Sequence, residues 1–206
     1  MDRSLFLNLM NAMTTPSASE FTQFNVPTES TVFGCSLRDA APVLDLALQA
    51  LYELRQAHPD ATPSNVKAVY MSPWKSHLLT DKLQPLIDLV ASKIKEASVR
   101  FSGLDLTGLN YDLAVADCWC AMYDTSDYTI PHNHMPSTYS AVVYLEMDAG
   151  SSPIVFNNTV AANPTSATLV FFPGHLLHHV PATEGKRKVV VINYLAMPAL
   201  LAPAMK

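Results

Sequence analysis

The chain reads PHNH at residues 131–134 and YSAVVYLEM at residues 139–147. The second stretch is a short run rich in Val, Tyr and Leu, which is typical of a β-strand. More runs of this kind follow Gly103, separated by turn-forming residues, at 111–123, 153–156, 167–172 and 188–195. We therefore predict that the second half of the chain is all β.

Two amphipathic helices are predicted before these strands. Apolar residues recur at helical spacing between residues 38 and 57 and again between residues 83 and 95. Pro85 should lie in the first turn of the second helix, because proline is tolerated there and not further along. Helices followed by short strands indicate an α+β chain, with the helices packed outside a β-sandwich or barrel.

The whole of residues 1–206 is predicted to form a single domain, since this length suffices to bury one core and no break in composition divides it. Within it we expect an N-terminal arm at 1–30, a helical support region at 38–103, a β core at 104–196 and a tail at 197–206.

Composition excludes several classes of protein. Hydrophobic residues make up 49% of the chain and charged residues 15%, which fits a folded protein and not a disordered one. The formal net charge is -5, and the only dense cationic run is Lys186-Arg187-Lys188, too short to bind nucleic acid by itself. No apolar stretch approaches the roughly 20 residues that cross a bilayer. We expect a cytoplasmic protein that acts on a small molecule or peptide, without nucleic-acid or membrane partners, and a homodimer stays open.

Three cysteines, Cys35, Cys118 and Cys120, do not indicate a disulfide framework. Cys118 and Cys120 should lie on one face of a strand, because side chains alternate along it. We interpret them as buried thiols without a catalytic role.

Five of the seven histidines fall in two short segments of the β half. His132 and His134, two residues apart, would project from the same side of an extended strand and could bind one metal ion. A solvated strand face would give the same pattern by chance. The second segment, FFPGHLLHHV at residues 171–180, could supply a third imidazole, from His178.

Arg187 is the candidate anion-binding residue. Strand alternation places it on one face with Val189, Val191 and Asn193, which would point into the barrel. The alternative is a solvated hairpin end. An inward arginine requires an anionic partner, because a buried unpaired charge is costly, and a dicarboxylate would provide one.

Several motifs in this order resemble a known family: the PHNH stretch, SAVVYL at 140–145, PIVF at 153–156, Phe172-Pro173 through His178-x-Val180, then Arg187 and Asn193. They are similar to Fe(II)/2-oxoglutarate oxygenases of bacteria and phages that carry a Pro-His-Asn-His motif. The resemblance covers roughly residues 111–194. It implies a double-stranded β-helix, a jelly-roll or cupin-like barrel with the N-terminal helices packed outside.

The resemblance also implies the residues of the site. It assigns iron to His132, His134 and His178, and the far carboxylate of 2-oxoglutarate to Arg187. Tyr123, on the strand before the metal pair, could donate its hydroxyl to the cosubstrate, and Asn193 is a weaker candidate of the same kind. Tyr123 is equally well explained as a core tyrosine with a polar tip. His134 stands where the wider superfamily has a carboxylate, and either Asp124 or Asp127 could be the third ligand if its loop folded back.

Neighbouring histidines and aromatics have less specific interpretations. His179 cannot enter the barrel together with His178, because adjacent strand residues face opposite ways. His175 is more often exposed in such a turn. Trp74 and His77 could line a substrate entrance, although a Trp beside a proline is usually a packing anchor.

The implied activity is that of a dioxygenase using Fe(II), 2-oxoglutarate and O2, hydroxylating an unidentified substrate with release of succinate and CO2. Two alternatives remain. One is a cupin-like three-histidine metal dioxygenase that does not use 2-oxoglutarate. The other is a noncatalytic barrel that binds a metal, a ligand or a partner.

Overall fold

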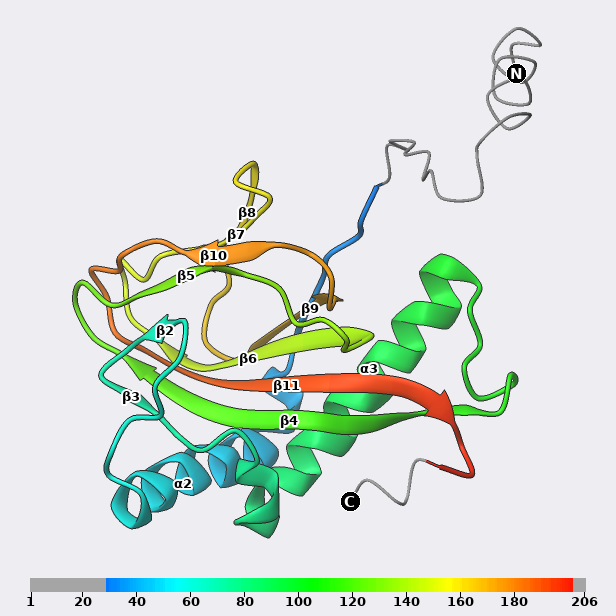
Figure 1. The fold of residues 1–206 in the computed structure, drawn as a ribbon, viewed down its shortest axis with the longest axis horizontal. Helices are drawn as coiled ribbons and strands as arrows, with labels where there is room; N and C mark the ends of the chain where they lie inside the picture. Colours follow the sequence, from blue (N-terminus) through cyan, green and yellow to red (C-terminus); the bar gives the residue numbers. More distant parts are fainter. Residues whose placement is uncertain (1–28, 202–206) are drawn as a thin grey trace, which may run out of the picture.

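Two antiparallel sheets face each other, and two long helices cover the outer side of one of them, in a computed structural model that describes residues 29–201 (Figure 1). The predicted N-terminal arm lies outside the described residues except for its last two positions, and so does the end of the predicted tail, 202–206. The mixed α and β composition predicted from the sequence is confirmed.

The larger sheet has the strand order β1-β9-β6-β11-β4-β3. Its strands, in chain order, are β1 (Phe33–Ser36), β3 (Tyr70–Met71), β4 (Tyr111–Tyr123), β6 (Tyr139–Met147), β9 (Thr168–Pro173) and β11 (Arg187–Pro198). β11 lies in the middle and pairs with β4 from Arg187 opposite Tyr123 to Pro198 opposite Tyr111. The long strands β4, β6 and β11 form one wall of the cavity described below.

The smaller sheet has the order β2-β5-β10-β7-β8. Its strands are β2 (Val66–Lys67), β5 (Tyr128–His132), β7 (Ile154–Phe156), β8 (Val160–Ala162) and β10 (His178–Val180). Most of these strands are short and irregular, and β10 lies between β5 and β7. The sequence runs at 111–123, 139–147, 153–156, 167–172 and 188–195 all form strands. β5 and β10 contain His132 and His178, for which strands were expected, whereas β1, β2, β3 and β8 were not predicted.

The helices are η1 (Arg38–Ala40), α2 (Ala41–Ala57), η2 (Ser76–Leu78), η3 (Asp81–Leu83) and α3 (Gln84–Ser102). Both predicted helices are confirmed, and Pro85 lies in the first turn of α3 as expected. α3 ends at Gly103, whose positive φ of 65° suits glycine and whose N–H donates to the carbonyl of Val99 at 3.2 Å. Among the described residues no helix is both long and apolar enough to span a bilayer.

The two faces of β11 pack in two different hydrophobic cores. Val190, Ile192 and Tyr194 pack in the core between the larger sheet and the helices, and the Tyr194 hydroxyl donates to the carbonyl of Ile87 on α3 at 2.8 Å. Val189 and Val191 belong to the second core, between the two sheets. The predicted alternation along β11 is therefore confirmed, and Arg187 faces the space between the sheets.

The cysteines are free thiols in the described residues, and Cys118 and Cys120 lie together on the helix-facing side of β4. Burial raises the pKa of Cys120 to about 12 and that of Cys118 well above its ordinary value. Such thiols stay protonated and unreactive, which confirms the interpretation of both as packing residues.

Candidate active site

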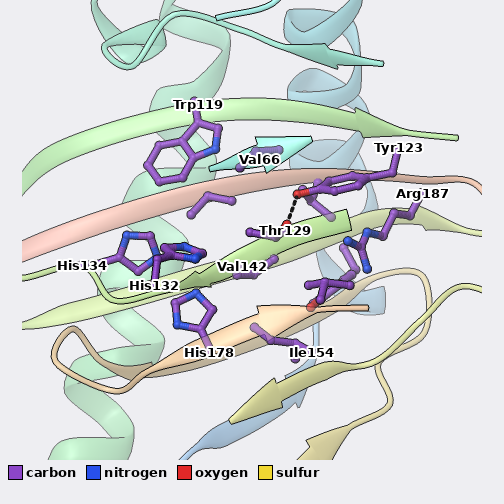
Figure 2. Close-up of a pocket in the computed structure, with 14 residues that line it drawn as sticks. Val66, Trp119, Tyr123, Thr129, His132, His134, Val142, Ile154, His178 and Arg187 are labelled. Carbon is purple, nitrogen blue, oxygen red and sulfur yellow. Dashed lines mark hydrogen bonds between the residues drawn. The ribbon is translucent and has the colours of Figure 1, made fainter. Parts of the chain in front are cut away.

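Three histidines meet between the sheets (Figure 2). His132 on β5 is paired directly with His178 on β10, and their ring centroids lie 4.3 Å apart. His134 follows two residues later, and one ligand atom from each of the three rings lies within 4.8 Å of the others. The strand pairing of β5 with β10 thus brings together residues that are far apart in the sequence.

His134 is not on a strand. β5 ends at His132, and the N–H of His134 donates to the carbonyl of Gly174 at 2.7 Å. The prediction that one strand carries both histidines was therefore wrong for His134, whose position depends on a turn. That turn requires glycine at 174, since a Cβ there would lie 2.0 Å from the carbonyl oxygen of Ser137.

The ring nitrogens of His132 and His178 are already oriented. The Nδ1–H of His132 donates to the carbonyl of Ile130 at 2.8 Å, and the Nδ1–H of His178 donates to the carbonyl of Leu176 at 3.0 Å. A carbonyl only accepts, so in each neutral ring Nδ1 carries the hydrogen and Nε2 keeps its lone pair. Both rings can therefore ligate a metal through Nε2.

Burial keeps these histidines neutral. It lowers the pKa of His134 to about 2 and that of His178 to about 4, and it also lowers the pKa of His132. The charges that neighbouring imidazoles would carry lower the pKa of His134 and His178 further. Near neutral pH the cluster offers uncharged nitrogen donors, the form that binds metals.

Loss of stability at acid pH is the measurable consequence. Unfolded histidine has a pKa of about 6.5, whereas folded His178 has a pKa of about 4, so between these values the unfolded chain binds more protons. The free energy of unfolding is therefore highest above about pH 6.5, where His178 is neutral in both states, and it decreases as the pH falls towards 4. In denaturant titrations of the metal-free protein, we expect the free energy of unfolding to fall between about pH 7 and pH 5, and to fall less in His178→Gln. If the free energy of unfolding fell equally with pH in the wild type and in His178→Gln, the burial of His178 in its neutral form would be contradicted.

No carboxylate joins the cluster among residues 29–201. One carboxylate oxygen of Asp127 accepts the N–H groups of Val69 and Asp124, at 2.8 and 2.7 Å. Asp124 accepts the N–H of Thr125 at 2.8 Å and pairs with Lys186 at 3.3 Å. Both aspartates stabilise their own turn, so the loop does not fold back to supply a third ligand.

Arg187 lies at the other end of the cavity from the histidines (Figure 2). Its side chain is buried, with residue exposure of 2%, and its guanidinium carbon lies 3.9 Å from the ring centroid of Tyr123. One nitrogen donates to the carbonyl of Ser152 at 3.1 Å, while Nε has no partner. Within the described part of the chain no carboxylate forms an ion pair with Arg187. Its buried guanidinium can therefore bind an anionic ligand.

The two lysines beside Arg187 point elsewhere. Lys186 pairs with Asp124, and Lys188 pairs with Glu146 on the neighbouring strand β6. Arg187 is therefore the cation of this run that faces the cavity, and the alternative of a fully solvated hairpin end is excluded.

The cavity itself is narrow, about 40 Å³, and largely apolar between its two polar ends. Tyr123 forms part of the wall, and its hydroxyl shares a hydrogen bond of 3.0 Å with Thr129. The apolar lining consists of Val66, Trp119, Val142, Ile154, Val180, Val189 and Val191. This shape suits a slender molecule with polar groups at both ends.

A wider, open cleft of about 430 Å³ lies on the outer side of the histidines and shares His132, His134 and Trp119 with the cavity. Trp74 lines this cleft and packs edge to face against Trp119, with ring centroids 4.8 Å apart. Asn193 also lies here and not in the lining of the Arg187 cavity; its amide nitrogen is 3.3 Å from Nδ1 of His134.

The remaining histidines lie away from the cluster. His179 is half-buried beside His178, as strand alternation predicts. His175 is exposed and lies 3.4 Å from the hydroxyl of Ser30. His77 lines a separate groove beside α3, so of the two residues proposed for a substrate entrance, Trp74 alone adjoins the histidines.

Several contributors to the site were not predicted, among them Thr129, Trp119 and Ser152. Trp119 shares a strand face with Ala121 and Tyr123, and this alternation could have revealed it. Ser152 contributes only a backbone carbonyl, for which no side-chain pattern exists.

No family model and no curated protein matches the sequence. Solved structures do match. A prolyl-4-hydroxylase from Pseudomonas putida is 15% identical, with 81% of this chain and 92% of that chain covered and a TM-score of 0.54. The epimerase SnoN, in complex with Fe3+, alpha ketoglutarate and nogalamycin RO, is 14% identical with coverages of 81% and 79% and a TM-score of 0.56. The carbocyclase SnoK is 11% identical with coverages of 82% and 82% and a TM-score of 0.60.

At these identities the likeness establishes the fold. The chain shares the fold of these three proteins, and it places a three-histidine cluster between its sheets. The neighbours are named as a hydroxylase, an epimerase and a carbocyclase, so the fold alone does not determine the reaction.

Proposed function

We propose that the protein is an Fe(II)- and 2-oxoglutarate-dependent dioxygenase that hydroxylates its substrate and releases succinate and CO2. The observation that carries this proposal is a narrow cavity with three neutral histidines at one end and, at the other, a buried arginine that has no carboxylate partner among residues 29–201. We further propose that the facing sheets are the two halves of a double-stranded β-helix barrel in one domain.

The histidines fit a metal ion. Their ring nitrogens lie close together, carry no charge near neutral pH, and in two cases are held by backbone carbonyls with Nε2 free. His132, His134 and His178 would hold Fe(II), which when bound supplies the activation of O2 and the oxidation of a substrate C–H bond. The protein's own contribution is to orient the ligands and limit the access of water.

Arg187 and its neighbours fit the far end of a dicarboxylate. The guanidinium would bind a carboxylate with charge-assisted hydrogen bonds, while the Tyr123 ring and the Ser152 carbonyl hold it in place. The hydroxyls of Tyr123 and Thr129 already bond to each other, and either can redirect its hydrogen towards an added oxygen. Val189 and Val191 exclude water between the two ends of the cavity.

The substrate would enter from the open cleft, a small molecule or peptide placed against Trp74. The cleft meets His132 and His134 from the side opposite Arg187, so substrate and cosubstrate would not compete for space. Its charged residues, Lys75 and Asp117, pair with each other at 3.3 Å. No cationic surface therefore favours nucleic acid in this cleft.

A second candidate function rests on the ligand set. Three imidazoles without a carboxylate leave a bound divalent metal with its full charge, which also suits a cupin-like three-histidine dioxygenase that does not use 2-oxoglutarate. In that case Arg187 would bind an acidic substrate directly.

The test is succinate formation from isotopically labelled 2-oxoglutarate by protein loaded with Fe(II) anaerobically and then exposed to O2. We expect slow succinate formation even without a hydroxylatable substrate, its loss in His178→Ala, and its retention in the matched control His179→Ala. An iron-loaded wild type that consumes O2 with an added organic acid but forms no succinate would favour the three-histidine alternative.

A further inference from the structure

Asn193 brings a polar side-chain group against a ring nitrogen of the third histidine, His134. It is 4% exposed, lies on β11 opposite Ser140 of β6 and Asp117 of β4, and brings its amide nitrogen to 3.3 Å from Nδ1 of His134. The other end of the same amide, Oδ1, is buried without a hydrogen-bond partner. Either the nitrogen or the oxygen of the Asn193 amide could therefore form the hydrogen bond with Nδ1 of His134.

The orientation of the amide determines which ring nitrogen of His134 carries the hydrogen. If the amide N–H donates to Nδ1, then Nδ1 uses its lone pair, and in a neutral ring the hydrogen lies on Nε2. Nε2 could not then bind a metal, and Oδ1 would stay unpaired. If the amide turns by 180°, Oδ1 accepts from Nδ1–H and Nε2 is freed, while the amide nitrogen takes the place where Oδ1 has no partner. The two ends of an amide have nearly the same shape, so this change requires no repacking.

We infer that Asn193 is a positioning residue, which accepts the Nδ1–H of His134 through Oδ1 and so directs the Nε2 lone pair of His134 into the histidine cluster. Asn193 would accept the Nδ1–H of His134 as the backbone carbonyls of Ile130 and Leu176 accept the Nδ1–H groups of His132 and His178. The relevance for metal binding rests on the proposed function, but the tautomer is a property of the metal-free protein.

The need for a side-chain acceptor follows from the fold. His132 and His178 lie on strands, where each finds a carbonyl two residues back in its own chain segment. His134 lies beyond the end of β5, in the turn held by Gly174, and its Nδ1 faces β11 instead. The inner face of β11 is otherwise apolar between Arg187 and this position, where Val189 and Val191 point. Asn193 therefore supplies a polar atom where the strand itself cannot.

The test compares Asn193→Asp with Asn193→Leu. Aspartate keeps the shape of asparagine and presents only acceptors near neutral pH, whereas leucine is of similar size and presents none. If Asn193 accepts from His134, the aspartate variant retains the wild-type tautomer of His134. If Asn193 donates, the wild type and the aspartate variant differ in tautomer, because aspartate can only accept and moves the hydrogen of His134 to Nδ1. Thermal unfolding of both variants shows whether either fails to fold.

The first readout is the histidine tautomer, measured by long-range ¹H–¹⁵N correlation on metal-free protein at about pH 7.5, with His134 assigned through His134→Gln. We expect the Nδ1–H form for His134 in the wild type and in Asn193→Asp, and a mixture in Asn193→Leu. The second readout is the affinity for Co(II), measured by competition with a chelator. Asn193→Leu should weaken it by about 10- to 100-fold, the usual effect of losing such a partner, and Asn193→Asp by less than about threefold.

An Nε2–H tautomer for His134 in the wild type, or a loss of Co(II) affinity in Asn193→Asp equal to that in Asn193→Leu, would overturn the inference. If the tautomer is as expected but the wild type does not bind Co(II), the inference about Asn193 stands and the proposed metal site fails. The two outcomes are therefore distinguishable.

Discussion

Replacing His178 by alanine is expected to weaken metal binding by at least about 100-fold, because it removes one of three ligands from a site that the protein builds only in the folded state. Replacing His179 by alanine should change the affinity by less than about threefold. The physical reason is strand geometry: His178 lies in the cluster opposite His132, while the next side chain points away. Anaerobic titration of each variant with Fe(II) measures the effect.

His179→Ala is the matched control, since it removes the same side chain from the adjacent position of β10. A comparable loss of Fe(II) affinity in both variants would contradict the geometry of the cluster. Thermal unfolding of the metal-free variants shows whether His178→Ala remains folded, and a folded variant that still binds Fe(II) tightly would exclude His178 as a ligand.

Replacing Arg187 by methionine is expected to weaken binding of 2-oxoglutarate by about 10- to 100-fold, the effect of losing a charge-assisted pair. Lys188→Met should have little effect, since Lys188 pairs with Glu146 outside the cavity. The same Arg187 variant should melt at an equal or higher temperature in the absence of ligand. The reason is that the buried guanidinium forms no ion pair among residues 29–201, and methionine removes an uncompensated charge at similar length.

Calorimetry on the Fe(II)-loaded variants and thermal unfolding of the ligand-free variants measure the two effects. Unchanged 2-oxoglutarate affinity in Arg187→Met, with a loss in Lys188→Met, would move the cosubstrate to the other side of β11. A large drop in melting temperature for Arg187→Met would show that the arginine serves the fold rather than a ligand.

The long strands could be predicted from the sequence because each packs on both faces. β4 and β6 occur within the bounds that their apolar runs indicated, and the alternation from Val189 to Tyr194 separates the two cores as expected. β2 and β3 contain two residues each and could not be predicted, since they are strands only through their partners β5 and β4. Their contribution also means that the sheets draw on the first half of the chain.

The candidate site could be predicted in its residue types but not in its construction. The spacing of His132 and His134 suggested one strand, yet the structure places His134 in a turn that depends on Gly174. The contact of Asn193 with His134 joins β11 to a turn that is distant in the sequence, and a single sequence carries no signal for it. The orientation of Arg187 could be predicted, because strand alternation is a local property.

We propose that one cavity holds a metal at its histidines and a dicarboxylate between that metal and Arg187. The most direct test of this proposal is calorimetric titration of 2-oxoglutarate into the protein loaded anaerobically with Fe(II), comparing the wild type with His134→Ala and Arg187→Ala. We expect binding that requires Fe(II) in the wild type and is lost or strongly weakened in both variants. Absence of binding by the iron-loaded wild type, or binding unaffected by either substitution, would contradict the proposal.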